Sequence, residues 1–241
     1  MKNLPLGHLK VSSGTIDDAI KFIYDCISSQ SKAYCIPLNL TKYVLSKSDE
    51  KLKQVIREAN MIISDGVPIV WLSKRAGYND VQRITGIDLA EKIFQTAQKK
   101  GWSLFFLGAS EENLKKAVEN LTERFSGIRI VGYHHGYFKD HEVDSVIDCI
   151  NRSSVDVLLL ALGLPQKEYF VADHLEKIDI RFCLTVGGAV DIWAGTKKRT
   201  PASIQRLGLE WLYRSIYDMS RARLIARYGI SFLKELIFYK K

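Results

Sequence analysis

The sequence alternates short apolar segments with amphipathic ones, and this alternation restricts its fold more than any other feature. Apart from Asp156, Val155 to Ala161 is an apolar run, the pattern of a strand covered on both faces. Further strands are predicted at residues 33–38, 61–64, 103–107, 128–131 and 182–186. Helices are predicted over residues 49–58, 87–97, 110–125 and 143–150. Two further helices are predicted to begin at Thr15 and at Pro165. Strands that alternate with helices predict an α/β fold with a mainly parallel sheet flanked by helices.

The composition places the chain among ordinary globular proteins. It has 241 residues, of which 46% are hydrophobic and 26% charged. Its longest apolar stretch, from Val157 to Leu164, is about eight residues, whereas a membrane-spanning helix needs about twenty. The first residues lack the apolar core of a signal peptide, so we expect a cytoplasmic protein.

The C-terminal segment differs from the rest of the chain. From Pro201 onward the pattern is helical, amphipathic and rich in arginine and aromatic residues, with no further strand. Residues 196–241 hold eleven basic and three acidic side chains, which accounts for the whole formal net charge of +8. We therefore expect a catalytic domain over residues 1–195 and a basic helical appendage over residues 196–241. Such an appendage suits an anionic ligand or membrane surface.

Ligands of parallel α/β sheets bind beyond the carboxyl ends of the strands. The residues just past the predicted strand ends are Asn39, Thr41, Asp65, Gly108, Gly163, Gln166, Gly187 and Gly188. Function is therefore to be sought among these positions.

Three aspartates have both a structural and a functional interpretation. Asp65 precedes Gly66, so it can belong to a turn, or it can be a general base that a strand end partly desolvates. Asp88, near the start of a helix, can complement the helix dipole or bind substrate. Asp191 can bind a hydroxyl group or cap a helix.

Several features suit a phosphate group. Gly108 and Ser110 connect a strand to a helix, and Gly187 with Gly188 allows close approach to the backbone. A plain turn explains the first pair equally well. No GxGxxG motif is present, which disfavours a dinucleotide cofactor.

Arginines of the appendage fall at helical spacings, either on a solvated face or toward an anionic ligand. The positions concerned are Arg214, Arg221, Arg223 and Arg227.

Neither metal nor thiol chemistry is indicated. The adjacent His134 and His135 point in different directions and have no carboxylate at ligand spacing. Four scattered cysteines without a CxxC motif predict reduced thiols. No Ser/His/Asp or Cys/His signature of nucleophilic catalysis is present either. Since the histidines lack ligand spacing and no GxGxxG motif occurs, we expect neither a bound metal nor a cofactor.

Seven segments together resemble one family, over about residues 10 to 230. They are SDGVPIVW (64–71), RITGIDL (83–89), FFLGAS (105–110), GYHHGYF (132–138), LGLPQKEYF (162–170), TVGGAVDIWAGTKKRTP (185–201) and GLEWLYRSIYDMSRARLIARY (208–228). The chain is similar to the WecG/TagA/CpsF glycosyltransferases, glycosyltransferase family 26. The resemblance implies a Rossmann-like domain with a C-terminal helical appendage.

The resemblance also implies an activity. These enzymes serve bacterial cell-surface polymer synthesis, teichoic acid included, and move a sugar from a UDP-sugar to a polyprenyl-diphosphate-linked sugar at the inner face of the membrane. The donor sugar is N-acetylmannosamine, its uronic acid or a glucose-type sugar. The reaction inverts the anomeric centre without a bound metal. A peripheral association with the membrane and a possible homo-oligomer are implied for this chain.

The resemblance carries over to individual residues. Asp65 matches the family's proposed general base, and Asn39 matches a pocket asparagine. Arg83 and Gln166 match polar pocket residues near the donor, and Arg214 and Arg221 match arginines that reach the diphosphate, with Arg223 or Arg227 as a third. Pro37 stands where the family often has threonine, so a hydroxyl contact is lost.

Three other functions compete with this one. A nucleotide-binding oxidoreductase or methyltransferase is disfavoured because no GxGxxG motif occurs. A nucleic-acid-binding module could use the basic tail, but the neutral body offers no further basic track, so we expect no nucleic-acid partner. A non-catalytic scaffold would not need the pocket residues.

Overall fold

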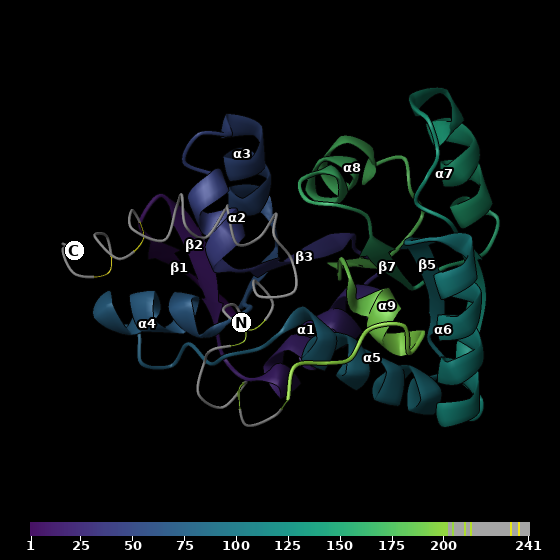
Figure 1. Cartoon of the computed structure of the whole chain (residues 1–241), viewed down its shortest axis with the longest axis horizontal. Helices are drawn as coiled ribbons and strands as arrows, with labels where there is room; N and C mark the ends of the chain where they lie inside the picture. The colour runs from purple at the N-terminus through teal and green to yellow at the C-terminus, as the bar shows by residue number, and fades with distance from the viewer. Residues whose placement is uncertain (202–203, 205–209, 211–212, 214–231, 233–235, 237–241) are drawn as a thin grey trace. The chain divides into compact units, whose positions relative to one another are not determined.

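The computed structural model describes residues 1–201 together with residues 204, 210, 213, 232 and 236 (Figure 1). The chain forms two compact units. Unit 1 comprises residues 1–15, 37–85 and 199–241, and unit 2 comprises residues 16–36 and 86–198. A six-stranded sheet has the order β4-β3-β8-β7-β5-β6, and β3 contributes residues to both units. The predicted α/β fold class, a parallel sheet flanked by helices, is confirmed.

Unit 2 is built on parallel strands. Its pairings join β3 to β8, β8 to β7, β7 to β5 and β5 to β6, all of them parallel. Every residue of β5, β7 and β8 is buried, as their continuous apolar sequences predict. The bounds of the strands are β3 Ala33–Leu38, β5 Ser103–Gly108, β6 Arg129–His134, β7 Val157–Ala161 and β8 Phe182–Thr185.

Helices cover both faces of the unit 2 strands. In Figure 1, α7 and α8 lie above β5 and β7, and α1 and α5 lie below them. An aromatic cluster fills part of the core, where Trp193 packs edge-on against Phe94 and Phe106 at centroid distances of 5.0 and 6.0 Å. The helices are α1 Ile16–Ser28, α5 Gly86–Lys100, α6 Glu111–Arg124, η1 Asp140–Glu142, α7 Val143–Asn151, α8 Gln166–His174 and α9 Ala189–Trp193.

Unit 1 begins with a hairpin that the sequence did not predict. Strands β1 (Lys2–Leu6) and β2 (Leu9–Ser13) pair antiparallel, and β2 lies beside β4 (Met61–Ser64). The Ser12 hydroxyl accepts a hydrogen bond of 2.8 Å from the Ile62 backbone N–H. The unit also contains the helices α2 Leu40–Leu45, α3 Glu50–Glu58 and α4 Val67–Arg75.

The C-terminal segment is described at only a few positions. Residues 204, 210, 213, 232 and 236 are helical, in agreement with the predicted appendage. Phe232 is 4% exposed, and its ring packs edge-on against Tyr43 at 6.0 Å. This side chain is therefore buried within unit 1. The division at residues 195 and 196 stays a prediction.

The cysteines behave as predicted. All four are free thiols, and Cys26, Cys35 and Cys183 are buried while Cys149 is exposed. Burial raises the pKa of the Cys183 thiol, and the nearby Cys35 and Glu168 raise it further. Cys183 is therefore a packing residue rather than a nucleophile.

Candidate active site

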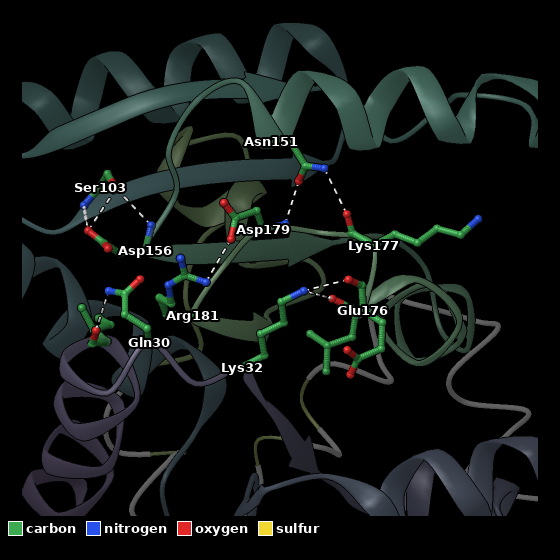
Figure 2. Close-up of polar contacts among 11 residues, drawn as sticks. Gln30, Lys32, Ser103, Asn151, Asp156, Glu176, Lys177, Asp179 and Arg181 are labelled. Atoms are coloured by element: carbon green, nitrogen blue, oxygen red, sulfur yellow. Dashed lines mark hydrogen bonds and ion pairs between the residues drawn. The ribbon is translucent and has the colours of Figure 1, made fainter.

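The amino-terminal ends of the unit 2 strands are joined by polar contacts (Figure 2). The Asp156 carboxylate accepts hydrogen bonds from the backbone N–H and hydroxyl of Ser103, at 2.8 and 3.0 Å. Arg181 donates to Asp179 at 2.9 Å, and the Lys32 ammonium donates to the Glu176 carbonyl at 2.7 Å. These side chains act on one another and on the backbone, so this edge has a structural role.

In unit 1, the backbone brings three predicted site residues to the same place. The Asp65 N–H donates to the Leu38 carbonyl at 2.8 Å, which sets Asp65 beside the end of β3, where Asn39 follows. Arg83 forms an isolated parallel bridge with Ser64, the residue before Asp65. Asn39, Asp65 and Arg83 are all partly exposed. The ends of β3 and β4 therefore gather an amide, a carboxylate and a guanidinium.

The turn after Asp65 depends on the glycine rather than on the aspartate. Gly66 has a φ of +128°, a conformation that residues with a side chain rarely adopt. Pro68 then lies in the first turn of α4, where its missing N–H costs nothing. The base assignment of Asp65 stays a prediction, and the turn alone does not explain the aspartate.

Helix α2 fixes Asn39 and a buried cation. The Asn39 side chain caps the helix by accepting a hydrogen bond of 3.1 Å from the Lys42 N–H. The Lys42 ammonium donates to the Pro37 carbonyl at 2.8 Å, and the residue is only 4% exposed. Thr41, in the same first turn, is partly exposed. Lys42 was not predicted, because a lysine next to a threonine gives no sign of burial in the sequence.

Arg83 makes an ion pair with a residue of the C-terminal segment. Its Nη2 donates to Glu210 Oε2 at 2.9 Å, and the two side chains are 25% and 18% exposed. The sequence did not predict this ion pair, since Arg83 and Glu210 are 127 positions apart in the chain.

In unit 2, tight packing accounts for Gly108. Its φ is +119°, and a Cβ there would lie 2.4 Å from the backbone carbon of Ala161. Gly136 packs against the same place, with its N–H donating to the Ala109 carbonyl at 2.9 Å. The glycine is thus required for packing between β5, β7 and the loop after β6, and a role for Gly108 in binding stays a prediction.

Asp191 belongs to a local polar network. Its carboxylate accepts from the Asn113 amide at 2.9 Å and pairs with the Lys197 ammonium at 2.6 Å. Its backbone carbonyl accepts from the N–H groups of Thr196 and Lys197. This network connects α9 to α6 and to the following turn. The Asp191 side chain does not cap α9, whose N-cap is Gly188, and the hydroxyl-binding interpretation stays a prediction.

The glycine pair after β8 differs between its two members. Gly187 has a φ of +55°, and a Cβ there would lie 3.8 Å from the Cε of Lys167. A Cβ on Gly188 would meet nothing within 4 Å, and Gly188 is exposed. Of the two, Gly187 alone has a φ in the left-handed region that favours glycine.

Helix α8 buries a charged pair that the sequence did not reveal. Gln166, the predicted pocket residue, is exposed, whereas Lys167 and Glu168 are 6% and 0% exposed. The ammonium and carboxylate groups of this pair are 3.3 Å apart. Burying two charges costs free energy, so the pair must serve a structural or functional purpose in this turn. The LPQKEYF segment gives no apolar spacing that could distinguish the inward residues.

The remaining predicted residues are only partly described. Asp88 lies in the first turn of α5 and is partly exposed, which fits both interpretations given for it. Arg214, Arg221, Arg223 and Arg227 lie outside the described residues. Within the described part of the chain, no three His, Cys, Asp or Glu side chains gather as a possible metal site.

A family model of known proteins decides the relationship. The model described as "Glycosyl transferase WecG/TagA/CpsF family" matches residues 4–241. The chain belongs to the WecG/TagA/CpsF family of glycosyltransferases. The resemblance drawn from the seven sequence segments is thereby confirmed, and so is the enzyme class.

Relatives of this glycosyltransferase carry a common name, N-acetylglucosaminyldiphosphoundecaprenol N-acetyl-beta-D-mannosaminyltransferase. The chain is 29% identical to that of Bacillus spizizenii over 224 residues, covering 92% of this chain and 86% of the relative. It is 30% identical to that of Bacillus subtilis over 190 residues, covering 78% and 73%. It is 31% identical to that of Staphylococcus aureus over 168 residues, covering 70% and 65%.

Among the described residues of this glycosyltransferase, none of the helices has the length and apolar character to span a lipid bilayer.

Proposed function

We propose that this glycosyltransferase moves an N-acetylmannosamine-type sugar from a UDP-sugar to a polyprenyl-diphosphate-linked N-acetylglucosamine. Its relatives are named for an N-acetylmannosaminyl transfer to N-acetylglucosaminyldiphosphoundecaprenol, which supports both the sugar and the acceptor. The observation that carries the proposal is the gathering of Asn39, Asp65 and Arg83 at the ends of β3 and β4. A uronic acid or glucose-type donor is the alternative, because Pro37 replaces a threonine common in the family.

The proposed chemistry is a single inverting displacement. Asp65 takes the proton of the acceptor hydroxyl as its oxygen bonds to the anomeric carbon of the sugar. The bond between that carbon and the β-phosphate oxygen breaks, and UDP leaves with the electron pair. Positive groups must then stabilise the departing diphosphate, and Arg83 is suited to this by its planar guanidinium.

We propose that no metal takes part and that protein groups alone neutralise the diphosphate. Arg83 is assigned to this task together with Arg214 and Arg221 and with Arg223 or Arg227. The basic segment of residues 196–241 is proposed to associate with the anionic inner face of the bacterial membrane, where a lipid-linked acceptor would reside.

A screen with product detection by mass tests the proposal. Purified full-length chain is incubated with a set of UDP-sugars and a polyprenyl-diphosphate-linked N-acetylglucosamine, with and without chelator. We expect a product heavier by one N-acetylhexosamine residue from UDP-N-acetylmannosamine, formed at the same rate with chelator. Transfer from a uronic acid or glucose-type donor alone would replace the proposed donor. Activity abolished by chelator and restored by Mg²⁺ or Mn²⁺ would show that metal-free neutralisation is wrong.

A further inference from the structure

The backbone of Arg83 is held firmly beside the proposed base. Arg83 bridges Ser64, and the next residue, Ile84, donates its N–H to the Ser64 carbonyl at 3.1 Å. Because Ser64 directly precedes Asp65, the Cα of Arg83 cannot move without disturbing the end of β4. These backbone contacts do not fix the guanidinium of Arg83, because it lies at the end of a long and flexible side chain.

Glu210 restrains the side chain of Arg83. Its carboxylate accepts from Arg83 Nη2 at 2.9 Å, with 18% of the Glu210 side chain and 25% of the Arg83 side chain exposed. The helix-surface pair Lys116–Glu112 is far more open, at 49% and 76%. A half-buried pair is screened less by salt than a surface pair, so it restrains its members more strongly.

The surroundings of Glu210 in the sequence make this contact unusual. Residues 196–241 hold eleven basic side chains and only three acidic ones. One of those three acids is paired with a guanidinium of unit 1 across 127 positions of sequence. The mainly basic C-terminal segment thus places a carboxylate beside the guanidinium of Arg83, which the proposed donor site needs.

We propose that Glu210 is a positioning residue for Arg83. This inference rests on the proposed function, because it assigns Arg83 to the donor diphosphate. The Arg83–Glu210 hydrogen bond engages Nη2 of the guanidinium, whose N–H donors lie in one fixed plane. Holding that plane in place before the donor binds reduces the rotamer entropy that is lost on binding.

Glu210→Gln tests the proposal with little change in shape. We expect kcat/KM for the UDP-sugar to fall by about 10-fold to 100-fold, the cost of a misplaced catalytic contact. The KM for the lipid-linked acceptor should stay within about twofold of wild type. Glu210→Asp keeps the negative charge and should recover part of the lost kcat/KM. A glutamate with a merely structural role would not require this recovery. Asp179→Asn removes an exposed ion pair of the same 2.9 Å length in unit 2 and should leave both constants unchanged.

A double-mutant cycle shows whether Glu210 acts through Arg83. In an Arg83→Gln background, Glu210→Gln should have an effect of less than about twofold, because its partner is gone. Unfolding midpoints of all variants, measured at the same concentration, show whether any variant loses activity by unfolding. Where Glu210→Gln unfolds, Glu210→Asp in the two backgrounds gives the same comparison.

Several results would overturn the inference. Wild-type kcat/KM in Glu210→Gln would do so, as would an equal loss in the Arg83→Gln background. Tighter UDP binding by Glu210→Gln would instead identify an inhibitory contact. A wild-type chain that transfers no sugar refutes the proposed function and this inference together, whereas an active wild type with an unaffected Glu210→Gln refutes the inference alone.

Discussion

At the scale of single residues, the ends of β3 and β4 fix the backbone of Asp65, the proposed general base. Its N–H is bound to the Leu38 carbonyl, and Gly66 makes the turn that follows. The carboxylate is therefore carried on a fixed backbone, next to the bridge that holds Arg83. A base needs such fixed placement more than it needs an unusual pKa.

Asp65→Asn should lower turnover by about 10²-fold to 10⁴-fold, because the amide keeps the shape of the carboxylate and loses its basicity. UDP affinity, measured by titration calorimetry, should stay close to that of the wild type. Turnover within a few-fold of wild type would remove the assignment. Asp49→Asn is the control, since Asp49 lies outside the proposed site and caps α3 by accepting from the Leu52 N–H at 2.9 Å.

The charged pair in α8 makes a second prediction at this scale. Glu168 is fully buried beside the ammonium of Lys167. Glu168→Gln leaves that ammonium buried without its carboxylate, and we expect the free energy of unfolding to fall by about 3–5 kcal/mol. Urea denaturation measures the loss.

The double variant Lys167→Met with Glu168→Leu is the control for this pair. It removes both charges and should recover most of the lost stability. A double variant less stable than Glu168→Gln would show that the pair is needed for more than its own neutralisation.

At the scale of elements, the two ends of the unit 2 strands are held by different kinds of contact. Figure 2 shows the starts of the strands joined by Ser103, Asp156, Asp179 and Arg181, which satisfy one another's hydrogen bonds. The loops at the opposite ends are close-packed through glycines instead. A Cβ on Gly108 would meet the end of β7, and a Cβ on Gly136 would meet the Leu162 side chain and the Cα of Gly108, so neither position has room for one. The shape of these loops is thus determined by backbone contact.

Gly108→Ala should be much more destabilising than Gly101→Ala. Both glycines have positive φ, at +119° and +73°, so each alanine carries a conformational cost of about 1–2 kcal/mol. Only at Gly108 would the methyl group meet the backbone of Ala161, which adds about 1–3 kcal/mol of overpacking. Thermal unfolding of the two variants measures the difference. Equal midpoints would mean that β5 and β7 can separate without cost.

At the scale of the whole molecule, the distribution of charge supports the proposed membrane association. The entire formal net charge of +8 lies within residues 196–241. Two described residues of that segment, Glu210 and Phe232, contact Arg83 and Tyr43 in the earlier part of unit 1. These contacts favour a segment docked on its own unit at those two positions over one that is wholly detached.

Lys240→Glu should weaken binding to anionic liposomes, because each basic side chain near such a surface contributes about 1 kcal/mol. Co-sedimentation with anionic and neutral vesicles measures this binding. Arg221→Glu should weaken it similarly and should in addition reduce sugar transfer more strongly, since only Arg221 is assigned to the substrate. Lys115→Glu, on the exposed side of α6, should leave both measurements unchanged. Equal transfer rates for Arg221→Glu and Lys240→Glu would contradict the assignment of Arg221.

The sequence by itself determined the strands of the sheet and the family. Strands such as β7 and β5 are buried on both faces, so their apolar runs are a local signal that survives without any knowledge of the fold. The N-cap Ser110 was likewise predictable, because capping depends on neighbours three residues away. The β1–β2 hairpin was missed, because five-residue strands containing Pro5 give too short an alternation to recognise.

Only the tertiary structure decided which side chains meet. Successive residues of a helix differ by about 100° in direction, so the sequence could not tell that Lys167 turns inward while Gln166 turns to solvent. The backbone bridge between Arg83 and Ser64 brings Arg83 near Asp65, and no local sequence pattern encodes such a contact between segments. The Glu210 partner of Arg83 lies 127 positions away. Local patterns specify elements because their causes are local, whereas a site is made of distant residues that only packing brings together.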